Sequence, residues 1–170
     1  LCALKVWCPL ELPQDPTSER DRFLREARAA SQLDHPHIVH IDAGGVWDQP
    51  WGELAFVVME LLPGRDLSYY AQRQRLLPEA LVVELGLQLA GALHHAHRHG
   101  IVHRDVKPSN VMFDPARAQA WLTDFGLARL PNADHTKSGV MLGSPAAMAP
   151  ELLAGEPANA KTDLYALGVL

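Results

Sequence analysis

The sequence has little cysteine, no long apolar run and no excess of basic residues. Cys2 and Cys8 are its only cysteines, and two thiols near one end do not make a disulfide framework, so we expect a reducing compartment. The longest apolar stretch, Leu54 to Met59, is far shorter than the ~20 residues of a membrane-spanning helix. A net charge of −5 offers no basic field for nucleic acid or for an anionic membrane. These absences predict a cytoplasmic chain without a membrane segment of its own, although an anchor could lie outside these residues.

The composition that remains is that of an ordinary globular protein, with 48% hydrophobic and 21% charged residues among 170. The chain opens inside a strand-like run, Leu1 to Trp7, and closes on an apolar helical run, Leu164 to Leu170, that has no capping residue. Natural domains seldom begin and end inside secondary-structure elements. We therefore expect this sequence to be part of a longer domain.

The first third of the chain has the pattern of three strands and one helix. Strands are expected at residues 1–7, 38–43 and 54–60, with a turn containing Trp47 and Trp51 between the last two, and a helix at 17–33. In that helix Phe23, Ala27 and Ala30 recur with helical spacing, and Glu26 lies at the edge of the apolar stripe. The stripe predicts an amphipathic helix with one buried face.

After the connector at 61–64 the pattern becomes mainly helical. Helices are expected at residues 66–75, from Pro78 to Gly100, at 151–154 and from Lys161 onward. The apolar stripe of the long helix consists of Val82, Leu85, Leu89, Leu93 and Ala96. Strands followed by helices, with a connector between them, predict an α+β fold with two subcores and a cleft at the connector.

Two short motifs carry the chemistry of this sequence. The run 103–110, His-Arg-Asp-Val-Lys-Pro-Ser-Asn, places a carboxylate, a lysine and an asparagine within six positions of one another. The run 124–126, Asp-Phe-Gly, adds a second carboxylate fourteen residues after Asn110. Together these groups can hold a metal-bound triphosphate and orient a hydroxyl toward it. In this order and spacing the motifs resemble the catalytic loop and the metal-binding turn of the eukaryotic-like (Hanks-type) protein kinases. With a lysine at position 107, the loop resembles that of the serine/threonine branch of the family.

The resemblance implies a partial bilobal protein-kinase fold. Residues 1–60 would form a partial small lobe, 61–67 the hinge, and 68–170 a partial large lobe with the catalytic loop and the activation segment. The implied reaction transfers the γ-phosphate of ATP, with Mg²⁺, to Ser or Thr hydroxyls of protein substrates. The family's glycine-rich loop and its last helices would lie outside Leu1 to Leu170, so we expect this chain alone to be weakly active or inactive.

The resemblance also assigns catalytic and metal-binding roles. Asp105 would accept or orient the proton of the attacking hydroxyl, and Lys107 would contact the transferred phosphate. Asn110 and Asp124 would bind magnesium, which takes few oxygen ligands from proteins. A solvated polar loop is the alternative reading of this run, and the eight-residue match disfavours it.

For the nucleotide, the resemblance implies a phosphate anchor at Lys5, paired with Glu26. A lysine in an apolar strand needs such a partner on physical grounds as well. The adenine site would be formed by Ala3, Met59, Glu60, Leu62 and Met112. Within it, Met59 would be the gatekeeper at the rear of the pocket, while the alternative for each residue is a plain core position.

Regulation would act through Arg104, which in the family often binds a phosphate on the activation segment. Thr136 and Ser138 are the candidate phosphorylation sites, with autophosphorylation as a possible route, because a phosphate there could pair with the guanidinium. Ser144 stands where the family usually has threonine and could reach the catalytic loop. Ala147 departs from the family, which usually has a tyrosine there, and leaves the choice of peptide substrate open.

Two further acids and a group of histidines complete the expectations. Asp163 matches the aspartate that anchors the catalytic-loop backbone, and Glu151 matches a glutamate whose arginine partner lies further downstream. Histidines occur at positions 94, 95, 97 and 99, and the spacing of His95 and His99 is compatible with zinc. No cysteine or carboxylate cluster accompanies them, which disfavours a metal site.

Two alternatives to a protein kinase stay open at this point. A pseudokinase or truncated module would bind nucleotide or partners without catalysis, and Ala147 favours it mildly. A kinase-like enzyme for a small molecule is disfavoured by Lys107-Pro108 and by Ala149-Pro150-Glu151, which in the family shape a peptide-binding surface.

Overall fold

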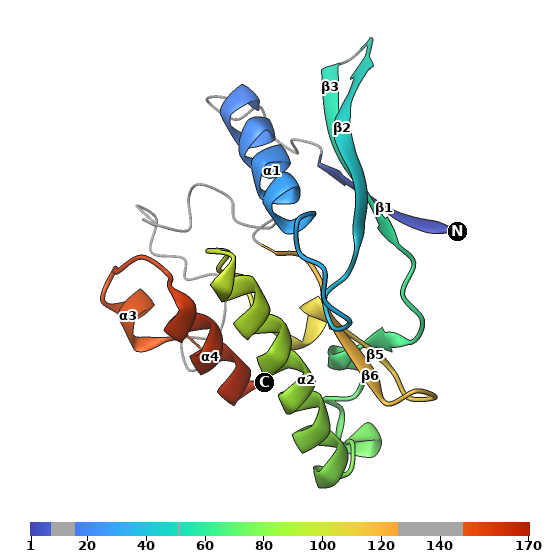
Figure 1. Cartoon of the computed structure of the whole chain (residues 1–170), viewed down its shortest axis with the longest axis vertical. Helices are drawn as coiled ribbons and strands as arrows, with labels where there is room; N and C mark the ends of the chain where they lie inside the picture. Colours follow the sequence, from blue (N-terminus) through green and yellow to red (C-terminus); the bar gives the residue numbers. More distant parts are fainter. Residues whose placement is uncertain (8–15, 51, 126–147) are drawn as a thin grey trace.

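A computed structural model of the chain describes residues 1–7, 16–50, 52–125 and 148–170 (Figure 1). The described elements fall into a first sheet with one helix, a second small sheet, and three further helices. The predictions for Cys8, Trp51 and residues 126–147, which include most of the activation segment, lie outside the described residues.

The first sheet is antiparallel with strand order β1-β3-β2, where β1 is Cys2–Trp7, β2 is Ile41–Gln49 and β3 is Gly52–Glu60. Helix α1, Pro16–Ala30, lies against β2 and β3. Its residues Phe23, Ala27 and Ala30 are buried, as the stripe predicted. The sheet and α1 thus bury one shared face.

The predicted strand at 38–43 and the turn after it are wrong in their limits. Ile38 forms a bridge with Leu122 in the second sheet, and β2 begins only at Ile41, with a bulge before Ala43. The strand then continues through the two glycines, so Trp47 lies in β2 opposite Leu54 rather than in a turn. Cross-strand pairing with β3 outweighs the weak strand propensity of glycine here.

The predicted helix at 66–75 is also wrong. The segment forms a short strand, β4 (Arg65–Asp66), and two 3₁₀ turns, η1 (Leu67–Tyr69) and η2 (Arg73–Arg75). The Asp66 side chain accepts the Ser68 N–H at 2.9 Å and so caps the single turn η1, but the backbone is extended again at Gln72 (ψ 138°), so η1 and η2 do not join into one helix. Gly64, with φ +87°, brings the connector against the backbone of Phe113. β4 pairs with β5 (Val111–Asp114), which pairs with β6 (Gln119–Leu122).

The long helix α2, Glu79–Arg98, begins after Pro78 and is followed by Gly100 at φ +73°. Its buried residues are Leu85, Leu89, Ala92, Leu93 and Ala96. Val82, predicted to be in the core, is 53% exposed, because the packing of α2 against β6 and α4 buries positions from Leu85 onward.

The chain ends with α3, Pro150–Leu153, and α4, Ala160–Val169. Asn159 and Thr162 form a reciprocal capping box that starts α4. A single cluster of buried apolar side chains joins the first sheet, α1, α2 and the second sheet. In the described part of the chain, no helix is long and apolar enough to cross a membrane.

Candidate active site

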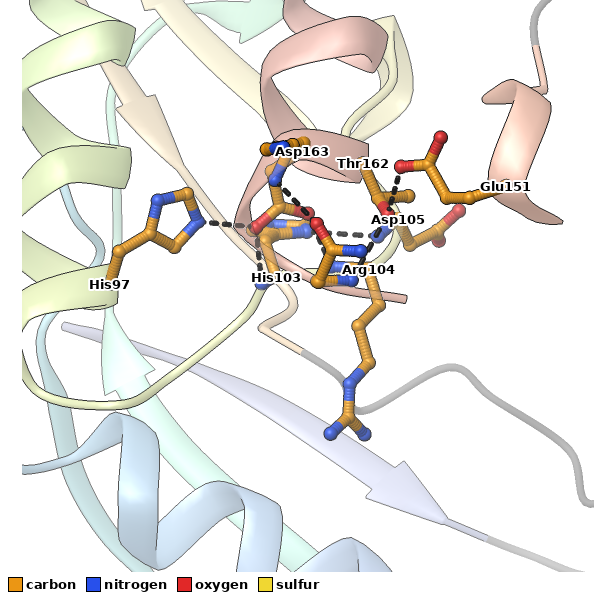
Figure 2. Close-up of polar contacts among 9 residues, drawn as sticks. His97, His103, Arg104, Asp105, Glu151, Thr162 and Asp163 are labelled. Carbon is orange, nitrogen blue, oxygen red and sulfur yellow. Dashed lines mark hydrogen bonds and ion pairs between the residues drawn. The ribbon is translucent and has the colours of Figure 1, made fainter. Parts of the chain in front are cut away.

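The catalytic-loop backbone is held by Asp163, a buried carboxylate on α4 that is 1% exposed. Its Oδ2 accepts the His103 N–H at 2.8 Å, and its Oδ1 accepts the Arg104 N–H at 2.7 Å. Arg104 has φ +70°, a left-handed conformation that is strained for a residue with a side chain. Figure 2 shows Asp163 between the loop and α2. The predicted anchoring role of Asp163 agrees with this geometry.

His97 on α2 completes this anchor, with its Nε2 2.7 Å from Asp163 Oδ2 (Figure 2). We predicted no role for His97 beyond membership of the histidine group. Its position shortly before Asp105 in the sequence is only a weak signal for this role. The packing of α2 against α4 brings the His97 ring to the Asp163 carboxylate.

His103 is fully buried inside the loop. Its Nε2 lies 2.8 Å from the Thr123 carbonyl oxygen, and its Nδ1 accepts the Asp105 N–H at 3.3 Å. Because one ring nitrogen faces an acceptor and the other a donor, the neutral ring carries its proton on Nε2. Burial lowers the pKa of His103 below its ordinary value. The ring also contacts Phe125, at 4.6 Å between centroids, and so links the loop to the residue after Asp124.

Two polar side chains of the catalytic loop converge on the Asp105 carboxylate. Asn110 donates its Nδ2 hydrogens to the Asp105 backbone oxygen at 2.8 Å and to Asp105 Oδ2 at 2.9 Å. Lys107 Nζ lies 2.7 Å from the same Oδ2. The loop therefore presents an oriented, partly exposed carboxylate beside a cation, which is an arrangement suited to binding a hydroxyl next to a phosphate.

Lys5 brings the first sheet to this site. Its Nζ lies 2.7 Å from Asp124 Oδ1, and both side chains are about one-quarter to one-third exposed, at 31% and 26%. Glu26 has contacts at 3.8 Å with Arg22 Nε and with Arg104 Nη1. The predicted pairing of Lys5 with Glu26 stays a prediction.

The residues predicted to contact adenine lie on paired strands and on the connector. Ala3 is opposite Met59 in the β1–β3 register, and Met112 is opposite Asp66 in β4–β5. The Glu60 side chain accepts the His40 N–H at 2.7 Å, so its carboxylate binds the α1–β2 connection. The predicted contact of Glu60 with adenine would then be made by its backbone and not by its carboxylate. Leu62 is partly buried against the core.

The oxygen atoms available at the site fit magnesium. Asn110 uses its amide nitrogen in both hydrogen bonds, and within the described residues its amide oxygen has no hydrogen-bond partner. Asp124 adds a carboxylate, and Mg²⁺ typically takes one or two such protein ligands. Among the residues described, no group of three or more His, Cys, Asp or Glu side chains could hold a metal ion. The histidines near the end of α2 are therefore not a metal site by this criterion, although the ring centroids of His95 and His99 lie only 4.4 Å apart.

Glu151 has a different partner from the downstream arginine expected for it. Its Oε1 accepts the Thr162 hydroxyl at 2.7 Å, and this bond lowers the pKa of the carboxyl. The contact joins α3 to the start of α4 (Figure 2). Thr136, Ser138, Ser144 and Ala147 lie outside the described residues.

Comparisons with known proteins agree with this arrangement. The chain matches the family model described as the protein kinase domain over residues 3–170. It is 38% identical over 158 residues to serine/threonine-protein kinase pkn3 of Myxococcus xanthus, covering 88% of this chain and 28% of that protein. It is 42% identical over 149 residues to PknK of Mycobacterium tuberculosis, covering 87% of this chain and 13% of that kinase.

The fold is similar to solved kinase domains as well. The PknI kinase domain of Mycobacterium tuberculosis has a TM-score of 0.72 and 34% identity, covering 98% of this chain and 60% of that solved chain. The structure therefore has a partial bilobal kinase fold, as predicted. The chain spans 28% of the length of pkn3 and 13% of that of PknK. From the anchored catalytic loop, the fold and these matches, we conclude that the chain belongs to the protein kinase domain family and is similar to bacterial serine/threonine-protein kinases.

Proposed function

We propose that the chain acts as the central part of a serine/threonine protein kinase that transfers the γ-phosphate of ATP to protein hydroxyls. The observation that carries this proposal is the convergence of Lys107 and Asn110 on Asp105 Oδ2, at 2.7 and 2.9 Å. A positioned carboxylate beside a cation supplies what phosphoryl transfer asks of the protein, namely orientation and charge neutralisation.

In the proposed reaction, Asp105 orients the acceptor hydroxyl and takes its proton. The hydroxyl oxygen forms a bond to the γ-phosphorus, and the bond from that phosphorus to the bridging oxygen of the ADP leaving group breaks. Lys107 stabilises the charge on the transferred phosphoryl group. When bound, Mg²⁺ would neutralise phosphate charge, and Asn110 and Asp124 would hold it.

The Lys5–Asp124 contact supports the same proposal for the nucleotide. The two side chains neutralise each other at 2.7 Å. Phosphate oxygens would replace the carboxylate as the partner of Lys5, and Asp124 would become free to bind metal. We also propose that Ala3, Met59, Leu62, Met112 and the Glu60 backbone form the adenine site, that residues 61–67 are the hinge between lobes 1–60 and 68–170, and that the protein is cytoplasmic.

For regulation, we propose that Arg104 binds a phosphate on Thr136 or Ser138, with Ser144 near the loop. Arg104 Nη1 lies 3.8 Å from Glu26 Oε1, and the side chain points away from Asp163 (Figure 2). A phosphate group would compete with that carboxylate for the guanidinium. Autophosphorylation is a route to this state, and replacement of both residues by alanine without any change in activity would contradict it.

The test measures transfer of labelled γ-phosphate from ATP and Mg²⁺ to protein by the full-length protein and by its Asp105→Asn variant. We expect phosphoserine or phosphothreonine with the wild type and loss of at least about a hundredfold in rate with the variant. Nucleotide binding and circular dichroism of the variant provide the controls for folding. A folded wild type that binds ATP but transfers no more than Asp105→Asn would favour the pseudokinase alternative.

A further inference from the structure

Three exposed arginines lie in the segment that follows the connector, and two of them contact the ring of one tyrosine. Arg65 follows the connector in β4, and Arg73 and Arg75 lie in η2. Between positions 65 and 75 the only carboxylate is Asp66, whose side chain accepts the Ser68 N–H. We refer to Arg65, Tyr69, Arg73 and Arg75 as the arginine–tyrosine surface.

The tyrosine ring positions two of the guanidinium groups. Arg65 Cζ lies 4.5 Å from the centroid of the Tyr69 ring, and Arg75 Cζ lies 4.1 Å from it. Cation–π contacts of this length are attractive, and they bring two like charges to a single ring. Two guanidinium groups are therefore held at the same ring, which reduces the entropy they lose when they bind an anion.

The charge of this surface is not compensated by the described part of the chain. Some arginines elsewhere in the structure contact carboxylates: Arg20 contacts Asp21 and Glu53, and Arg117 lies 3.9 Å from Asp114. Neither Arg65, Arg73 nor Arg75 forms an ion pair with a described residue. In a protein of net charge −5, this concentration of unpaired positive charge favours an anionic partner.

Ring contacts hold the arginine–tyrosine surface against β5, the strand that directly follows the catalytic loop. Tyr69 contacts Tyr70 edge-on at 5.1 Å, and Tyr70 contacts the buried Phe113 ring at 5.3 Å. Phe113 is also the β5 residue opposite Arg65 in the β4–β5 pair, and η1 packs against the turn that contains Asn110. An anion held here would lie one strand away from the catalytic loop.

We propose that the arginine–tyrosine surface binds an acidic segment of the protein substrate while the Ser or Thr of that substrate occupies the site at Asp105. Carboxylates fit the planar, forked guanidinium groups, and the proximity of β4 to the catalytic loop allows one extended segment to reach both places. The assignment of this segment to a substrate rests on the kinase activity proposed above.

The first test compares two synthetic peptides that differ only in the residues around a single serine, glutamates in one and glutamines in the other. With the full-length protein we expect kcat/KM to be about fivefold to tenfold higher for the acidic peptide, the effect of two exposed charge pairs. The double variant Arg65→Gln/Arg75→Gln should bring this ratio close to one. Arg28→Gln, an exposed arginine on α1, is the matched control and should keep the ratio.

The second test does not depend on turnover. Fluorescence anisotropy measures binding of an acidic peptide that lacks Ser and Thr, at about 0.05 M and about 0.5 M salt. We expect the affinity to fall several-fold at high salt and in the double variant. Tyr69→Phe should retain binding, because the ring face is kept, whereas Tyr69→Leu should weaken it.

The outcomes separate this proposal from the kinase proposal. Transfer to both peptides at equal kcat/KM, or equal binding by wild type and double variant, would overturn the surface proposal and leave the kinase proposal standing. Binding through the arginines without phosphorylation of any peptide would overturn the kinase proposal and the substrate assignment. Tighter binding of a single-stranded oligonucleotide or of anionic vesicles through the same arginines would assign the surface to another partner and overturn the proposal.

Discussion

Substitution of Asp163 by asparagine removes the charge that holds the catalytic loop while keeping the size of the side chain. The wild-type carboxylate accepts three hydrogen bonds: one at Oδ1 from the Arg104 N–H and two at Oδ2 from the His103 N–H and from His97. An asparagine has one acceptor oxygen, so its amide NH₂ must face a backbone N–H on one side. One buried donor is then left without a partner.

The magnitude follows from these bonds. A buried donor without an acceptor costs about 1–3 kcal/mol, and the remaining bonds lose about 1 kcal/mol when the acceptor becomes neutral. We therefore expect Asp163→Asn to lower the free energy of unfolding by about 2–4 kcal/mol. For a protein with a total stability of about 5–15 kcal/mol, this is a large fraction.

The assay is urea unfolding of the full-length protein, followed by tryptophan fluorescence. With a slope of about 2 kcal/mol/M, the expected loss moves the midpoint down by about 1–2 M. His97→Ala removes only the contact to Oδ2 and should have a smaller effect than Asp163→Asn. The double variant should lose less than the sum of the two, because both changes remove the same bond.

Unchanged midpoints for Asp163→Asn would refute this reasoning, since the loop would then be held by other contacts. Strict additivity in the double variant would refute the direct role of His97. A fall in midpoint with an altered slope would instead indicate a change in the unfolded state, and the free energy would then be compared at equal denaturant.

Three other predictions concern the parts of the fold that carry the site. A Cβ at Gly64 would lie 1.9 Å from the Phe113 carbonyl oxygen, so Gly64→Ala should separate β4 from β5 and lower the free energy of unfolding by more than about 2 kcal/mol in urea titrations. Leu89→Ala should cost about 2–5 kcal/mol in the same assay because Leu89 is fully buried in α2, whereas Leu87→Ala, at a position 71% exposed, should cost less than about 1 kcal/mol. Burial lowers the pKa of His103, so near pH 6.5 the unfolded state binds a proton that the folded state does not. The free energy of unfolding should therefore fall as the pH drops below about 6.5, by up to ~1.4 kcal/mol per pH unit. Urea midpoints measured from about pH 7.5 to 5.5 test this.

Matched variants decide each of these outcomes. Gly86→Ala, in the middle of α2 with no atom within 4 Å of an added Cβ, should stabilise the protein by a few tenths to ~1 kcal/mol, and equal effects at Gly64 and Gly86 would contradict the close approach. Equal losses for Leu89→Ala and Leu87→Ala would contradict the assigned face of α2. An identical pH slope in His103→Asn would show that other groups cause the dependence.

Some elements were predicted correctly because their signals are local. The stripe of Phe23, Ala27 and Ala30 indicates an amphipathic helix on its own, and α1 buries those three residues. Gly100 ends α2 where a left-handed residue is required. The segment at 66–75 was predicted incorrectly, because the pairing of β4 with β5 and the approach of Gly64 to Phe113 depend on a strand almost fifty residues away.

The sequence by itself determined the chemical equipment of this protein. The order and spacing of Asp105, Lys107, Asn110 and Asp124 resemble the protein kinase motifs, and the family model matches residues 3–170. Tertiary structure alone decided which partners these groups have. The pairing of Lys5 with Asp124 joins positions over a hundred residues apart. Such contacts depend on how helices and sheets pack, and side-chain identity along the chain does not specify that packing locally.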